Sequence, residues 1–418
     1  MPEPRVVIVG GGFGGLAAAK VLTRASADVL IIDRRNHHTF QPLLYQVATA
    51  GLAPSQIAVP IRRIMRGQAN LRVLLGEVVA IDTSGHVRLD SGKRIEFDFL
   101  IVATGALPGA ATTGAGWRRH PPGLKSIEDA TKIRSQILVA FERAEFAATE
   151  AEQEKLLTFA VIGGGPTGVE LAGAIAELGR RALATDFRAI RRHRIKVVLV
   201  HAGPRLLPAA PPSLSRYAAT ALEGLGVTVR LNSRVLNCSD DGLDLANEHI
   251  AAGTVVWAAG VEATPVARWL DIDADADGRV PVQPDLSVAG LPNIFVVGDA
   301  AGALTGKGLR LPGVAPVAIQ AGRFAGRKVL DRIHGRRSRR RFKYRDRGSM
   351  AAIGRQAAVV STPMFRLTGG FAWLVWSAFH VLAINDFRNR IAITLDWLWS
   401  YVTFERGARL ITHNGNEP

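Results

Sequence analysis

Two copies of a strand, glycine turn, helix and strand constrain the fold of this chain more than any other feature. In the first copy, the apolar residues 5–9 precede Gly10-x-Gly12-x-x-Gly15, a helix and a second strand that ends at Asp33. The first glycine permits the tight turn, the second lets a diphosphate approach the backbone, and the third lets the helix pack on the strand. The helix N-terminus offers free N–H groups to phosphates. The predicted first dinucleotide site comprises Gly10, Gly12, Phe13, Gly14, Gly15, Asp33, Arg34 and Val79.

The second copy begins at residues 158–162 and continues as Gly163-x-Gly165-x-x-Gly168. His201 stands where an acid would follow the next strand, and Arg205 lies four residues further on. A neutral imidazole neither supplies a carboxylate for the ribose 2′-hydroxyl nor repels a 2′-phosphate. We therefore expect weak discrimination, with NADH preferred and NADPH usable; the alternative is that His201 points to solvent and decides nothing. The predicted second site comprises Gly163, Gly165, Thr167, Gly168, His201 and Gly260.

Two such units in one chain predict an α/β protein with two Rossmann-like domains. They also predict two nucleotide ligands, most economically FAD and a nicotinamide cofactor. Between the copies, residues 87–97 and 99–102 are predicted to form a pair of strands. The length of 418 residues and the 48% hydrophobic content exclude a disordered chain.

Cysteine usage limits the redox chemistry. Cys238 is the single cysteine of the sequence, and it lies in a polar NCSDD segment where we expect a surface or half-buried thiol. One cysteine excludes a disulfide scaffold, an iron–sulfur cluster and a dithiol pair made within the chain. Electrons must then leave a flavin directly for a second substrate, and no metal site is predicted.

The net charge of +16 is concentrated near the C-terminus, because residues 323–347 hold twelve basic and two acidic side chains. Next to this segment, residues 371–384 and 391–404 are predicted to be apolar helices rich in tryptophan. Tryptophan favours the lipid headgroup boundary and arginine attracts anionic lipids, so the pattern predicts a monotopic anchor. The longest apolar run, residues 369–384, is shorter than the roughly twenty residues of a membrane span. A solvated basic loop, nucleic-acid binding and an aromatic dimer interface remain alternatives.

The two glycine turns, the ATG of residues 103–105 and the VVGDAA of residues 296–301 resemble the two-dinucleotide-binding flavoproteins, which include glutathione reductase and the ferredoxin reductases. The resemblance implies FAD at the first site, with Asp299 on its ribityl or diphosphate region and Thr104 and Gly105 beside the flavin. It also implies a discontinuous FAD domain, residues 1–120 and 281–335, with an NAD(P)H domain, residues 121–280, inserted into it. Residues 336–418 would then form the membrane-association region.

Residues 40–54, 313–325 and 387–411 resemble, more specifically, the type II NADH:quinone oxidoreductases, which are single-subunit and do not pump protons. The resemblance implies hydride transfer from NADH to FAD, then transfer of two electrons to ubiquinone or menaquinone. It implies peripheral attachment to the cytoplasmic face of a bacterial inner membrane. A homodimer is left open, and nucleic acid is not expected as a partner.

The same resemblance implies roles for single residues. Glu170, in the first turn of the helix that follows the second glycine turn, would bind substrate and protonate the quinone. Packing or NAD contact would also explain a glutamate at this position. Gln320 matches the second glutamine of the family's AQxAxQ motif, whereas Pro316 replaces the first glutamine. Asn385-Asp386 replaces the usual Ile-Gly, and a local change is expected there. The predicted quinone site comprises Tyr45, Gln46, Thr49, Ala315, Pro316 and Gln320.

Two other functions fit parts of the sequence. In a soluble ferredoxin- or rubredoxin-type reductase, the basic segment would dock an acidic carrier protein and the apolar tail would be a subunit interface. In a flavin-bearing redox sensor or nucleic-acid-binding protein, the arginine run would hold the partner.

Overall fold

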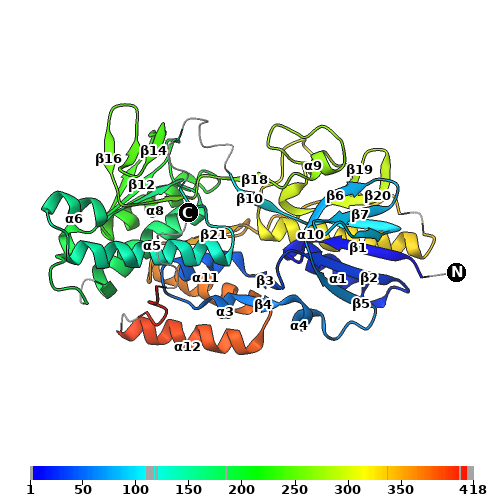
Figure 1. Ribbon diagram of the computed structural model, residues 1–418, viewed down its shortest axis with the longest axis horizontal. Helices are drawn as coiled ribbons and strands as arrows, with labels where there is room; N and C mark the ends of the chain where they lie inside the picture. Colours follow the sequence, from blue (N-terminus) through cyan, green and yellow to red (C-terminus); the bar gives the residue numbers. More distant parts are fainter. Residues whose placement is uncertain are drawn as a thin grey trace. The chain divides into compact units, whose positions relative to one another are not determined.

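The computed structural model describes residues 3–109, 117, 121–183, 186–336, 338–403 and 406–411. The chain divides into two compact units, and both are discontinuous in sequence (Figure 1). Unit 1 comprises Met1–His38, Val59–Leu107 and Glu262–Asp346. Unit 2 comprises Thr39–Ala58, Pro108–Val261 and Arg347–Pro418.

A six-stranded sheet forms the core of unit 1, in the order β19-β20-β9-β1-β2-β5. All neighbours are parallel except β19, which runs antiparallel to β20. The inner strands are apolar along most of their length because helices cover a parallel sheet on both faces. The strands are β1 (Arg5–Val9), β2 (Asp28–Asp33), β5 (Leu71–Leu75), β9 (Phe99–Val102), β19 (Ser287–Val288) and β20 (Leu291–Val296).

The predicted pairing of residues 87–97 with residues 99–102 is wrong. A turn at Gly92, which has a φ of +81°, reverses the chain, so residues 86–96 form two strands of a separate antiparallel sheet. Strand β9 instead pairs with β1, where Ile101 lies opposite Ile8. The small sheet comprises β6 (Val78–Asp82), β7 (His86–Leu89) and β8 (Arg94–Glu96).

Helices α1 (Phe13–Val21) and α10 (Ala315–Ile333) pack closely in unit 1. A side chain at Gly322 would overlap the carbonyl oxygen of Gly14, so a glycine is needed at position 322 where the two backbones meet. The close packing fixes the start of α1, which carries the first glycine turn. The other helices of unit 1 are η1 (Leu22–Arg24), α4 (Ile61–Met65), α9 (Val266–Trp269) and η6 (Gly298–Ala300).

Unit 2 contains a four-stranded parallel sheet in the order β13-β12-β11-β17. Its strands are β11 (Thr158–Ile162), β12 (Lys196–Val200), β13 (Val227–Arg230) and β17 (Thr254–Trp257). The helices around it are α5 (Ile127–Glu145), α6 (Glu150–Leu156), α7 (Pro166–Glu177), η3 (Leu178–Ala182), η5 (Arg192–Arg194) and α8 (Pro212–Gly224).

Two antiparallel sheets complete the strands within unit 2. One comprises β14 (Asn237–Ser239), β15 (Gly242–Asp244) and β16 (His249–Ala251), and the other β21 (Ser349–Ala352), β22 (Ala358–Ser361) and β23 (Arg366–Thr368). Cys238 lies on β14 opposite Leu243 and is fully buried, so the expectation of a surface or half-buried thiol is wrong. Four short strands each include a point in the sequence at which the chain passes from one unit to the other. They are β3 (His37–Thr39), β4 (Ala58–Pro60), β10 (Ala106–Pro108) and β18 (Val261–Ala263).

The remaining helices of unit 2 come from its first and last segments. They are η2 (Gln41–Leu43), α2 (Leu44–Ala48), α3 (Pro54–Ile57), α11 (Gly369–Ala383) and α12 (Phe387–Thr403). The two predicted apolar helices are confirmed, but α12 begins four residues earlier than expected. Asp386 explains this start, because its carboxylate accepts a hydrogen bond from Asn389 N at 3.3 Å and caps the helix. No helix in the described part of the chain is long and apolar enough to cross a membrane.

Candidate functional site

The first glycine turn has the geometry of a dinucleotide cradle. Gly10 has a φ of +103°, and side chains at Gly10 or Gly15 would overlap backbone oxygens. Gly12 differs, since a Cβ there would meet nothing within 4 Å. Gly11 N donates a hydrogen bond to Asp33 Oδ2 at 2.6 Å, which joins the turn to the end of β2. The turn is thus tightly packed on one side and open at Gly12, as a bound diphosphate requires.

The other residues predicted for the first dinucleotide site also lie in unit 1, and each has its own contacts there. Thr104 Oγ1 is 2.6 Å from Thr264 Oγ1, and Gly105 has a φ of +74°. Asp299 lies in η6, close to Gly313. Gly14 faces α10, Arg34 forms an exposed ion pair with Glu77 at 3.7 Å, and Val79 on β6 is 38% exposed.

Sequence reasoning missed His38, which lies beside the same turn. Its ring is buried, makes an edge contact with Phe13, and places Nδ1 3.2 Å from the carbonyl oxygen of Gly11. Burial lowers the pKa of His38 to about 4. The ring is therefore neutral at physiological pH, and Nδ1 carries the proton that it donates to Gly11. Nothing in the local sequence pattern distinguishes this histidine from His37.

The second glycine turn repeats the first in unit 2. Gly163 has a φ of +119°, a side chain at Gly168 would overlap the backbone, and Gly165 is as open as Gly12. Gly164 N lies 3.2 Å from His201 Nδ1, in the place that the Gly11 to Asp33 contact has in the first unit. An imidazole therefore stands where the first site has a carboxylate. Thr167 is exposed near the start of α7, and Gly260 O accepts a hydrogen bond from Trp257 Nε1 at 3.3 Å.

Arg205 is committed to its own loop. Its Nη1 donates to Ala210 O at 2.6 Å and its Nη2 to Pro208 O at 2.5 Å. Burial lowers the pKa of His201, although a backbone hydrogen bond with Arg205 opposes the shift, so the ring is neutral. The second site thus presents neither an acid at the end of β12 nor an uncommitted guanidinium from Arg205.

Glu170 is the fifth residue of α7, so it lies in the second turn of the helix and not in the first as expected. Its carboxyl group is almost fully buried and accepts a hydrogen bond from Ala352 N at 3.2 Å. Burial raises its pKa to about 8, and contributions from Ala352 N and the Trp376 side chain oppose that shift only partly. The Glu170 side chain is therefore a mostly protonated acid at neutral pH.

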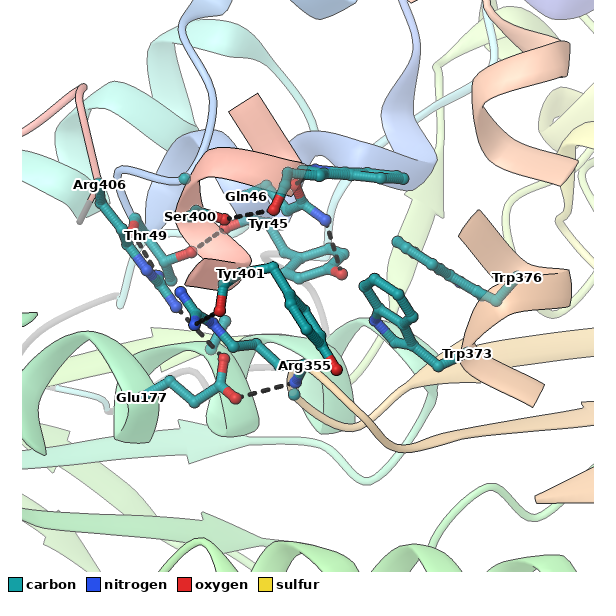
Figure 2. Close-up of a pocket in the computed structure, with 14 residues that line it drawn as sticks. Tyr45, Gln46, Thr49, Glu177, Arg355, Trp373, Trp376, Ser400, Tyr401 and Arg406 are labelled. Atoms are coloured by element: carbon teal, nitrogen blue, oxygen red, sulfur yellow. Dashed lines mark hydrogen bonds and ion pairs between the residues drawn. The ribbon is translucent and has the colours of Figure 1, made fainter. Parts of the chain in front are cut away.

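A pocket within unit 2 brings together three residues predicted for the quinone site. Tyr45, Gln46 and Thr49 lie on or directly after α2, and all three line this pocket (Figure 2). Its other walls are aromatic on one side and charged on the other. The aromatic residues are Trp373, Trp376, Trp397 and Tyr401, and the charged ones are Glu177, Arg355 and Arg406.

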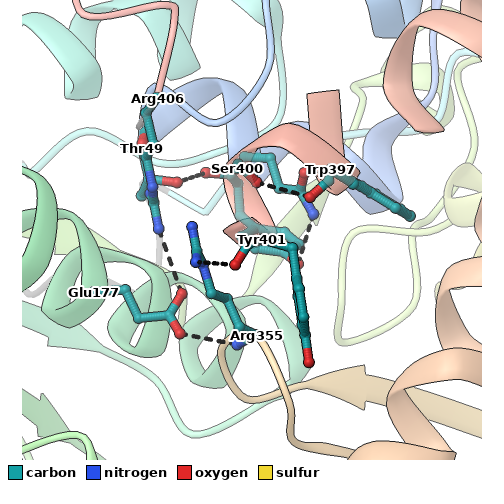
Figure 3. A network of polar contacts seen from close by, with 9 residues as sticks. Thr49, Glu177, Arg355, Trp397, Ser400, Tyr401 and Arg406 are labelled. Atoms are coloured by element: carbon teal, nitrogen blue, oxygen red, sulfur yellow. Dashed lines mark hydrogen bonds and ion pairs between the residues drawn. The ribbon is translucent and has the colours of Figure 1, made fainter. Parts of the chain in front are cut away.

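At the charged end of this pocket, hydrogen bonds and an ion pair connect Thr49, Arg406, Glu177 and Arg355 (Figure 3). The buried guanidinium of Arg406 donates through Nη1 to Thr49 O at 2.7 Å, and its Nη2 lies 3.4 Å from Glu177 Oε2. Glu177 Oε1 also accepts a hydrogen bond from Arg355 N at 2.9 Å. Sequence reasoning missed all three charged residues, although Glu177 follows Glu170 by seven positions and so shares its face of α7.

The other residues predicted for the quinone site belong to the first helical turns of α10 in unit 1. Ala315 and Pro316 open this helix, where a proline costs no hydrogen bond because the first N–H groups have no helical partner. Gln320 Nε2 donates to Arg345 O at 3.0 Å, and Gln320 Oε1 accepts from Arg345 N at 3.0 Å. Both ends of this amide therefore hold the main chain of the basic segment.

Helix α12 contacts α3 through polar side chains. Gln56 hydrogen-bonds Asp396, and Asn389 Nδ2 donates to Ser55 O at 3.1 Å. Large apolar side chains on α11 and α12 remain exposed: Phe371, Leu374, Phe379, Leu382, Phe387, Ile391, Leu395, Leu398, Trp399 and Val402. So much exposed apolar surface is typical of a face that contacts lipid or another protein.

Comparisons with known proteins agree with this geometry. The pyridine nucleotide-disulphide oxidoreductase family matches residues 4–322, and the NDH2 C-terminal domain matches residues 347–405. The type II NADH:quinone oxidoreductases NdhA and Ndh of Mycobacterium tuberculosis are 42% and 41% identical to this chain. Each alignment covers 98% of it, and 89% and 90% of the relatives.

Solved structures show the same fold. NDH2 of Plasmodium falciparum, solved in complex with NADH, has a TM-score of 0.85 at 20% identity and covers 96% of this chain and 98% of its own. The sulfide:quinone oxidoreductase of Aquifex aeolicus has a TM-score of 0.73 at 18% identity, with coverages of 98% and 96%. The likeness to the M. tuberculosis enzymes extends over nearly the whole sequence, so the chain belongs to the type II NADH:quinone oxidoreductase family.

Proposed function

We propose that this protein oxidises NADH through bound FAD and passes two electrons to a membrane quinone without pumping protons. One structural observation carries the proposal: two open glycine cradles occur in a chain whose single cysteine is fully buried. Such a chain has no dithiol of its own between the flavin and the final acceptor. Its membership of the family supports the same reaction.

The first cradle suits FAD. Gly12 leaves room for the diphosphate, the start of α1 offers backbone N–H groups, and Asp33 can accept hydrogen bonds from the adenosine ribose. Bound FAD would supply a two-electron carrier between NADH and the quinone. Thr104, Gly105 and Asp299 would contact it. Heat-released flavin should therefore be FAD, at about one per chain, and release of FMN would contradict this assignment.

Proton balance gives Glu170 its proposed role. The overall reaction, NADH + H⁺ + quinone → NAD⁺ + hydroquinone, takes up one proton from solution. Glu170 holds a proton at neutral pH because burial raises its pKa to about 8. A protonated acid of this kind can deliver a proton to the reduced acceptor and be reloaded from water.

We place the quinone ring in the pocket lined by Tyr45, Gln46 and Thr49. The aromatic wall offers flat apolar surface for a ring, and the tyrosine offers a polar contact. Ala315, Pro316 and Gln320, which the resemblance also assigns to the quinone site, stay predictions. Whether the natural acceptor is ubiquinone or menaquinone depends on the membrane, and both carry the same pair of carbonyl groups.

We place the protein peripherally on the cytoplasmic face of a bacterial inner membrane, and the exposed apolar residues of α11 and α12 support the contact with lipid. The basic residues 323–347, with a net charge of +10, would add attraction to anionic lipids. The FAD-loaded protein should float with vesicles that contain phosphatidylglycerol. If the protein stayed in the soluble fraction at low salt and did not float with the vesicles, the proposed attachment would be contradicted.

Replacing His201 by glutamate should sharpen the preference for NADH. The new carboxylate would stand beside Gly164 N, as Asp33 stands beside Gly11 N, and would repel a 2′-phosphate. We expect the ratio of kcat/KM for NADH to that for NADPH to rise about tenfold. The exposed His193→Glu is the matched control. An unchanged ratio in His201→Glu would show that His201 does not contribute to discrimination.

A further inference from the structure

A chain of two hydrogen bonds connects the C-terminal helix with the pocket (Figure 2). Trp397 Nε1, on α12, donates to Gln46 Oε1 at 2.8 Å. Gln46 Nε2, on α2, donates to the hydroxyl oxygen of Tyr45 at 3.1 Å. All three residues line the pocket, although Gln46 and Trp397 are 351 positions apart in the sequence.

The chemistry of these groups fixes the direction of the chain. An indole nitrogen is only a donor, so the atom of Gln46 that faces Trp397 must be the carbonyl oxygen. The amide nitrogen then faces Tyr45 and donates to it. Because its oxygen accepts this hydrogen bond, the Tyr45 hydroxyl must direct its own hydrogen elsewhere. Among the described residues, the Tyr45 hydroxyl makes no hydrogen bond other than the one it accepts from Gln46.

Tyr45 also remains a donor at every pH at which the protein works. The residue is 7% exposed, and burial, together with the nearby Glu170 and Glu177, raises its pKa well above the usual value of 10. Arg406 and the Gln46 amide lower it only in part. The hydroxyl therefore keeps its proton.

We propose that Tyr45 donates a hydrogen bond to a carbonyl oxygen of the acceptor in this pocket, and that Trp397 is a positioning residue that fixes this direction through Gln46. The inference rests on the proposed function and narrows it, because the pocket then selects acceptors with a carbonyl group. It also gives α12 a second role. Because this helix carries Trp397, it determines the direction in which the hydrogen bonds of Gln46 and Tyr45 point.

Gln46→Glu tests the direction without changing the shape of the side chain. A carboxylate accepts from both neighbours, so the Tyr45 hydroxyl would turn to donate to it and would be lost to the acceptor. In the FAD-loaded enzyme we expect KM for a soluble quinone analogue to rise about tenfold. Turnover with ferricyanide, which offers no carbonyl oxygen, should stay within about twofold of the wild-type value.

Trp397→Phe removes the indole donor and keeps an aromatic ring stacked on Trp376, whose ring lies 5.5 Å away. We expect a rise of about threefold in KM for the quinone, again without effect on ferricyanide turnover. Tyr45→Phe should match Gln46→Glu, and adding Trp397→Phe to it should cause no further loss, because both act through the same hydroxyl. Trp269→Phe, on α9 of unit 1, is the matched control.

Each outcome decides one of the two proposals. Normal quinone kinetics in Gln46→Glu would overturn the inference and leave the proposed function intact. Equal loss with quinone and ferricyanide would overturn it too, since these residues would then only support the fold. A wild-type enzyme that reduces ferricyanide but no quinone would contradict the proposed function itself.

Discussion

Replacing Glu170 by glutamine is expected to slow quinone-dependent turnover about a hundredfold, while FAD stays bound and ferricyanide turnover changes little. The amide fits the same buried space beside Ala352 N but cannot deliver a proton. Steady-state kinetics with both acceptors, together with the flavin absorbance spectrum, measure the effect. The exposed Glu223→Gln on α8 is the control. Equal losses with both acceptors would contradict a role in protonation.

The pH dependence gives this prediction a sign. Burial raises the pKa of Glu170 to about 8, so the protonated form dominates below that pH and is lost above it. The wild-type rate with quinone should therefore fall as the pH rises through about 8, and Glu170→Gln should lack this fall. Tyr45 keeps its proton over this range because burial, together with the charges of Glu170 and Glu177, raises its own pKa. Identical pH profiles for the two proteins would exclude Glu170 as the titrating group.

The same shift affects stability. The usual pKa of this carboxyl is 4.5, so between 4.5 and about 8 the folded state holds a proton that the unfolded state has released. The unfolding free energy should then decrease as the pH rises through that window. The difference between the wild type and Glu170→Gln should change in the same window and level off outside it.

Arg406→Ala should cost about 3–5 kcal/mol of unfolding free energy, the second large effect we expect. The change leaves the buried carboxylate of Glu177 without its guanidinium partner and frees Thr49 O. Urea unfolding of the FAD-loaded protein measures the loss. Arg409→Ala is the control, because Arg409 and Asp186 form a partly exposed ion pair that should contribute under about 1 kcal/mol.

A double variant separates charge burial from lost packing. Adding Glu177→Gln to Arg406→Ala removes the uncompensated charge, so part of the stability should return. If the double variant were as unstable as the sum of the two single variants, the Arg406 to Glu177 pair would not be the source of the loss.

The two dinucleotide units could be predicted because their information is local. A strand, three glycines at fixed spacing and a helix N-terminus lie within a few residues. The first glycine of each turn has a positive φ, the third meets the backbone closely, and the second is left open. The small sheet before β9 was missed for a local reason as well. The signal for the turn was present, because Asp90, Ser91 and Gly92 are residue types that favour turns, but the prediction treated residues 87–97 as one strand.

The pocket could be predicted only in part. Tyr45, Gln46 and Thr49 were found through resemblance, but Glu177, Arg355 and Arg406 come from segments far apart in the sequence. The protonation state of Glu170 and the contacts of Arg205 could not be predicted for the same reason. The pKa of Glu170 depends on what buries it, and the availability of Arg205 depends on where its own loop folds back.

Anaerobic reduction of the purified flavoprotein by NADH, followed by addition of a soluble quinone analogue or an acidic iron–sulfur protein, tests the central claim most directly. We expect bleaching of the flavin absorbance by NADH and its return upon addition of the quinone, at least as fast as steady-state turnover. The iron–sulfur protein should oxidise the flavin far more slowly. A reduced flavin that ignores the quinone and is rapidly reoxidised by the iron–sulfur protein would contradict the account.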